Sequence, residues 1–148
     1  MASDKELELY RTLTQSQQKY TYFLLAAAAG GIGLAVRATS DATLHWSLIP
    51  LAAAVLSWGT SFTQGCIHVM YTQSNTYANA ELLRVQRGEH PKAGTNPQLI
   101  QAAERGIKAA IESNEKWSGW HANGQFIFVV LGAAFFVAWH VLGIVLRS

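Results

Sequence analysis

The sequence predicts an all-α integral membrane protein, with three long transmembrane helices that extend into a cytoplasmic helical stalk. Half of its 148 residues are apolar and only 14% are charged, whereas about 25% is typical of a soluble domain. The apolar residues are collected into three blocks, each long enough to cross a bilayer. The predicted spans cover about residues 20–37, 44–71 and 125–146. They form a single membrane domain over residues 1–148, with cytoplasmic helical extensions at 3–19, 72–87 and 98–120 and a loop at 88–97.

The first block runs from Tyr20 to Val36 and carries no charge before Arg37. This is about the shortest stretch that crosses a hydrocarbon core of ~30 Å. The residues before it mix acids with bases, which does not match the basic start of a secretory signal. Ser3 followed by Glu6 matches a capping box, which indicates that the helix begins well before the membrane.

The second block, residues 44–71, holds no Asp, Glu, Lys or Arg, and Pro50 falls close to its start. Proline is tolerated there because the first turn of a helix has unsatisfied N–H groups in any case. A helical stripe then continues as far as Gly88. The loop at 88–97 contains two prolines and two glycines, which end the helix.

A third helix is predicted from Gln98, and it runs without a break into the last span. On its outer face, Glu104, Lys108, Glu112 and Lys116 form a ladder of i,i+4 pairs, which is typical of a solvated side. Another face alternates steps of three and four residues, which is the pattern of a coiled-coil seam. This stalk seam consists of Ile100, Ala103, Ile107, Ala110, Asn114 and Trp117.

The orientation follows from the distribution of Lys and Arg. Three of them precede the first span and six lie in residues 72–125, whereas the other two are Arg37 and Arg147. Under the positive-inside rule, this nine-to-two asymmetry places the N-terminus in the cytoplasm and the C-terminus outside. The bacterial inner membrane is the expected location.

A polar face on the second span is the most suggestive feature for function. In a bilayer, polar side chains turn away from lipid, so this face either packs against another helix or lines an aqueous path. Both alternatives remain open from the sequence. Its members are Ser57, Thr60, Ser61, Gln64 and His68.

Small residues are concentrated where helices could approach closely. Three helices cannot enclose a water-filled channel, so any pore requires several copies around an axis, and a homo-oligomer is expected. The predicted packing residues are Ala26, Gly30, Gly33, Gly65 and Gly132.

The sequence predicts no enzyme, no catalytic residue, no metal site and no cofactor. Arg84 and His90 have a spacing that some helical ribonucleases use, but such a pair arises easily by chance. Two cross-helix histidine pairs, His68 with His121 and His45 with His140, could be drawn as haem ligands. The two pairs would lie roughly 28 to 34 Å apart along the helices, which puts each haem in the headgroups rather than in buried protein. Acids and bases are interleaved and the net charge is only +2, which argues against nucleic-acid binding.

In architecture, the small spans with a short helical stalk resemble the compact membrane effectors of prokaryotic conflict systems, such as the two-span pore-type effectors. The third span departs from that plan. The leading hypothesis is a small homo-oligomeric membrane pore or channel-like protein. The alternative is a non-conducting membrane anchor or accessory subunit that recruits a cytosolic protein partner through its stalk. Membrane lipid and further copies of the chain are the other expected partners.

Overall fold

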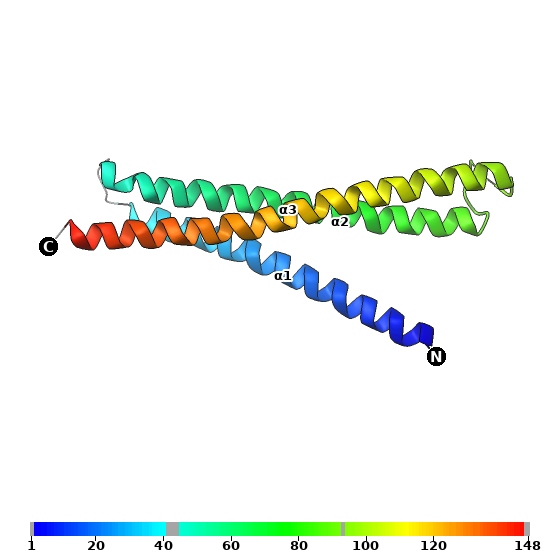
Figure 1. Ribbon diagram of the computed structural model, residues 1–148, viewed down its shortest axis with the longest axis horizontal. Helices are drawn as coiled ribbons and strands as arrows, with labels where there is room; N and C mark the ends of the chain where they lie inside the picture. Colours follow the sequence, from blue (N-terminus) through cyan, green and yellow to red (C-terminus); the bar gives the residue numbers. More distant parts are fainter. Residues whose placement is uncertain (1, 41–44, 93, 147–148) are drawn as a thin grey trace. The chain divides into compact units, whose positions relative to one another are not determined.

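The chain consists almost entirely of long helices (Figure 1). The computed structural model describes residues 2–40, 45–92 and 94–146, except the side chains of residues 2–7 and Tyr10. The predicted capping box and Arg147 therefore lie outside the described parts. The elements are α1 (Ala2–Ala38), a short 3-10 helix η1 (Trp46–Leu48), α2 (Ile49–Gln86) and α3 (Pro97–Val145). The described residues contain no strand, which confirms the all-α class.

The turn between α2 and α3 is shorter at its far end than the sequence predicts. Pro97, expected in the loop, is the first residue of α3. Asn96 is the reason, since its side-chain Oδ1 accepts a hydrogen bond of 3.0 Å from the N–H of Gln98. An Asn cap followed by proline is a favourable helix start, because proline lacks the N–H that would be unsatisfied there. Gly88 and Gly94 supply the positive φ angles, +72° and +51°, that the turn requires.

Within the part of the chain that the structure describes, two helices, not three, are apolar enough by length and composition to cross a membrane. One is the Arg11–Ala38 part of α1, and the other is α3. The second block is less hydropathic than a spanning helix requires, because its Ser, Thr, Gln and Trp residues lower its mean hydropathy, although it carries no full charge. The absence of charge is a weaker criterion than a favourable free energy of transfer, and the three-span prediction relied on the former.

The chain divides into two compact units. Unit 1 combines Met1–Gly65 with Ala122–Ser148, and unit 2 is Cys66–His121. The long helices α2 and α3 contribute to both. Unit 2 is an α2–α3 hairpin in which Val85 is fully buried.

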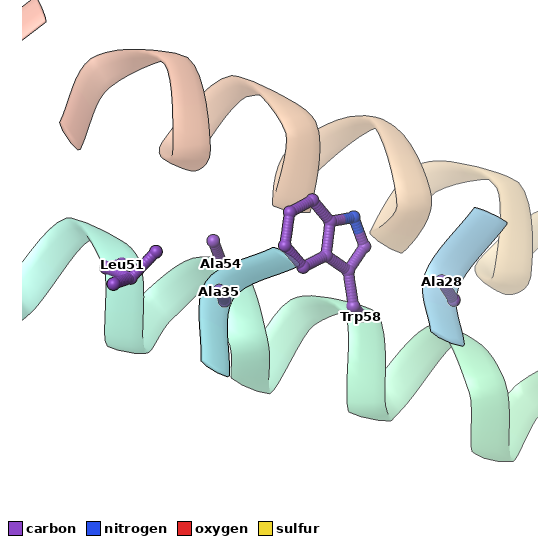
Figure 2. Close-up of a cluster of buried hydrophobic side chains, with 5 residues drawn as sticks. All are labelled: Ala28, Ala35, Leu51, Ala54 and Trp58. Atoms are coloured by element: carbon purple, nitrogen blue, oxygen red, sulfur yellow. The ribbon is translucent and has the colours of Figure 1, made fainter. Parts of the chain in front are cut away.

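The core of unit 1 is made mainly of small side chains and one indole (Figure 2). Figure 2 shows Trp58 projecting from α2 toward α3, with Ala54 on the preceding turn of the same helix. Small residues allow the helix backbones to approach closely, so one large ring fills much of the space between them. The cluster comprises Ala28, Ala35, Leu51, Ala54 and Trp58.

Candidate functional site

A buried polar node joins all three helices of unit 1. Ser61 is 0% exposed, and its hydroxyl donates a hydrogen bond of 2.7 Å to the backbone carbonyl of Gln125. Gln125 is 1% exposed, and its Nε2 donates to the backbone carbonyl of Thr21 at 3.3 Å. Gly65 provides the space, because a Cβ at that position would collide with the Gln125 amide and with Leu25. Ser61, Gln125 and Thr21 therefore connect α2, α3 and α1.

Trp58 forms a second link, about one turn before the polar node. Its Nε1–H donates to the carbonyl of Val129 at 3.3 Å, and its ring lies 5.7 Å from that of Phe136. Glycines flank the indole on both neighbouring helices. A Cβ at Gly31 would lie 2.7 Å from the indole ring, and one at Gly132 would also collide with it. Both glycines therefore make room for Trp58.

The predicted packing residues fall into two groups. Gly65 and Gly132 are buried and lie at the two contacts just described. Ala26, Gly30 and Gly33 are exposed on α1, and no atom lies within 4 Å of a Cβ built on either glycine. Small size alone could not distinguish the groups, because the face that a glycine presents depends on where the neighbouring helices lie.

The predicted polar face of α2 is divided between the two units. In unit 1, Ser57 is buried and donates to the carbonyl of Ala53 at 2.8 Å, whereas Thr60 is exposed and donates to that of Leu56 at 2.9 Å. Such bonds to the preceding turn satisfy a hydroxyl within its own helix. Gln64 is half-buried and lies against Gly124, where a Cβ would be 3.5 Å from the Gln64 amide carbon.

In unit 2, His68 is held against α3. Its Nδ1 lies 3.0 Å from the carbonyl oxygen and 2.9 Å from the hydroxyl oxygen of Ser118, a buried residue. Among the described residues, no group of three or more His, Cys, Asp or Glu could hold a metal ion. The contacts of His68 therefore connect α2 with α3 in unit 2.

The stalk seam of α3 is shifted relative to the sequence pattern. Ile100, Ala103, Ile107 and Asn114 are half-buried, and Asn114 donates to the Ser74 hydroxyl at 3.1 Å. Ala110 is exposed, and Trp117 is 50% exposed. The more buried positions are Ile111 and Ser118, one residue later in each case. At the first shift, burying Ile111 removes more apolar surface from water than burying Ala110. At the second, Ser118 is buried because its hydroxyl contacts His68 Nδ1, and Trp117 stays exposed.

Arg84 and His90 both lie close to the carboxylate of Glu81. Glu81 lies 3.6 Å from Arg84 and 3.2 Å from His90. The Nδ1 of His90 accepts the N–H of Lys92 at 3.2 Å, so Nε2 is the nitrogen directed at Glu81. These contacts tie the turn to the end of α2.

The sequence pattern did not identify Gln125, Trp58 or Gly31 as site residues. A glutamine at the start of a long apolar stretch was the available signal for Gln125, since a polar amide in such a position needs a partner. No protein-family model matches the chain, and comparisons with curated proteins and with solved structures found no match either. Function is therefore inferred from the contacts of the described residues.

Proposed function

We propose that this protein is a non-conducting membrane anchor or accessory subunit, which spans the bilayer three times and presents a cytoplasmic α2–α3 hairpin to a soluble protein partner. One observation carries the choice of anchor over pore. Ser61, at the centre of the polar face, is fully buried and bonded to Gln125 inside a single chain. A fully buried hydroxyl that donates to another helix exposes neither its hydrogen nor its lone pairs to water or to an ion in a conducting path.

The span formed by α2 is a proposal of its own, because among the described helices α1 and α3 contain a stretch apolar enough to cross a membrane and α2 does not. Its exposed hydroxyls, Thr60 and Thr63, both donate to carbonyls four residues earlier in α2. This internal pairing lowers the cost of placing a hydroxyl in lipid. We therefore include α2 as a span whose more polar groups are satisfied by its own backbone or by α3.

We further propose that the N-terminus is cytoplasmic and that the membrane is the bacterial inner membrane, following the distribution of Lys and Arg. Three spans place Ser40 outside and Thr95 inside. Both positions are exposed, so single cysteines can replace them in a background with Cys66 changed to Ser. An impermeant thiol reagent should label intact cells at position 40 only. Labelling of position 95 from outside contradicts this topology.

A second experiment distinguishes the anchor from the pore hypothesis. Ser61→Asp and Ser61→Lys each bury a charge in the proposed anchor, at a cost of about 2.5–3.5 kcal/mol or more at a helix centre. Both charged variants should lose the packing between the helices, whereas Ser61→Ala should lower the free energy of unfolding by only about 0.6–1.7 kcal/mol. Detergent-purified protein is compared by thermal unfolding, and reconstituted protein by planar-bilayer current.

Wild-type protein should be electrically silent in that comparison. The opposite result would be a wild-type current together with folded charge variants that shift cation-to-anion permeability in opposite directions. That outcome would establish a multi-copy pore and refute the anchor.

A further inference from the structure

An exposed aromatic cluster lies on α3 within unit 2. Trp117 and Trp120 are 50% and 65% exposed, and their rings meet edge-on with centroids 6.2 Å apart. His121 contacts both rings, and it stacks on Tyr71 of α2 at 5.8 Å with an interplanar angle of 16°. We call Tyr71, Trp117, Trp120 and His121 the aromatic collar. Large exposed rings held by other rings form a pre-ordered surface rather than loose side chains.

The two exposed indoles also differ from the buried one in their hydrogen bonding. Trp58 donates its N–H to Val129, whereas neither Trp117 nor Trp120 donates to any acceptor among the described residues. An indole combines an apolar body with a single strong donor. Such a side chain favours surroundings that are apolar on one side and rich in acceptors on the other, and the carbonyl and phosphate layer of a lipid bilayer has both properties.

The collar falls where the exposed surface of α3 changes character. The charged ladder ends at Lys116, and no Asp, Glu, Lys or Arg follows as far as Val145. From Phe126 to Leu146, the exposed large side chains are apolar, with the exception of His140. The uncharged part, Trp117 to Val145, is about 43 Å long at 1.5 Å per residue. A bilayer including both headgroup layers is about 40–45 Å thick. Trp117 and Trp120 occupy the first turn of this length.

We infer that the aromatic collar binds the headgroup layer of the cytoplasmic leaflet and sets the depth at which α3 crosses the bilayer. This inference rests on the proposed membrane anchor and assigns the collar's partner as phospholipid, through the ester carbonyls and phosphates that accept the indole N–H groups. It also reassigns Trp117, which belongs to a lipid contact rather than to the stalk seam.

Three exposed positions seven residues apart on α3 test the assignment: Ser113, Trp120 and Ile127. Each is replaced by a spin-labelled cysteine in the full chain with Cys66 changed to Ser, reconstituted in vesicles of phosphatidylcholine and phosphatidylglycerol. Accessibility to oxygen, which concentrates in lipid, is compared with accessibility to a water-soluble nickel chelate. The label at 113 should be aqueous, that at 127 in hydrocarbon, and that at 120 between them.

The outcomes separate this inference from the anchor proposal. If all three labels are equally accessible to nickel, the chain does not insert and the anchor proposal fails. If position 127 lies in hydrocarbon while position 120 is as aqueous as 113, or as deep as 127, the anchor stands and the collar assignment is overturned.

Removal of the rings supplies the second readout. In a Trp117→Ala and Trp120→Ala variant, the label at 127 should move toward water or deeper by up to one helical turn, roughly 5 Å. The corresponding double Phe variant keeps an aromatic ring at each position but lacks the indole N–H donors, so it should change the depth of the label less. Tyr77→Ala, an exposed aromatic outside the collar, serves as the control and should give none. An unchanged depth in the double Ala variant would refute the inference.

Discussion

Units 1 and 2 share the long helices α2 and α3, with α1 added in unit 1, yet they differ in the polar groups they bury and in the side chains they expose. Unit 1 buries the polar residues Ser61 and Gln125 and exposes large apolar side chains such as Phe126. Unit 2 buries Val85 and exposes a charged face, on which Glu104 and Lys108 pair at 3.7 Å. The first pattern suits a surface in lipid, and the second suits a surface in water.

The difference also lies in what holds the helices together. In unit 1, glycines admit an indole, and hydrogen bonds link the backbones. These contacts need no hydrophobic driving force, which is absent between helices in lipid. In unit 2, half-buried aliphatic residues are of the kind that the hydrophobic effect holds together in aqueous surroundings. A single helix can thus change its packing mode along its length, and the composition of its exposed face marks where.

The largest effect is expected from a charge in the core of the hairpin. Val85→Asp removes a fully buried aliphatic side chain and places a carboxylate there, at a cost of roughly 3 kcal/mol or more. Hydrogen–deuterium exchange of protein in lipid should rise in unit 2, at residues 74–86 and 97–114. It should stay low at residues 50–65 of unit 1, because contiguous units open independently.

Leu83→Asp is the matched control for that variant, since Leu83 is exposed on the same helix two residues earlier. It should leave exchange in both units near the wild-type level. Equal loss of protection in units 1 and 2 after Val85→Asp would show that the chain unfolds as one unit and that the contrast between them has no energetic meaning.

A smaller effect is expected from crowding the indole in unit 1. Gly31→Ala places a methyl group 2.7 Å from the Trp58 ring, and overpacking of this kind costs about 1–3 kcal/mol. Thermal unfolding followed by circular dichroism should show a lowered midpoint, and exchange should rise around Trp58 rather than around Val85.

Gly33→Ala tests the same substitution two residues further along α1, where no atom lies within 4 Å of the new methyl group. It should be neutral or stabilising, because alanine favours a helix over glycine by about 0.5–1 kcal/mol. Identical midpoints for the two variants would mean that Trp58 is not tightly enclosed by glycine.

Much of the fold could be predicted from local pattern. Uncharged apolar blocks and helical periodicity were enough to locate the three helices, and the glycines and prolines were enough to locate the turn at 87–96. The sequence predicted three sufficiently apolar helices, whereas two of the described helices qualify, because lack of charge was taken as hydrophobicity in α2. Pro97 was placed in the loop because a proline signals a break, whereas an Asn cap turns the same residue into a helix start.

The sequence by itself determined that the chain is helical, that Ser57, Ser61 and Gln64 share one face of α2, and that charge ends on α3 at Lys116. These properties depend on neighbours within a few turns of one helix. Only the tertiary structure decided that Ser61 bonds to Gln125, and that Gly31 rather than Gly30 receives Trp58. Such choices depend on how neighbouring helices are rotated and placed. Spacing along a chain specifies a face of each helix, but not which face of another helix meets it.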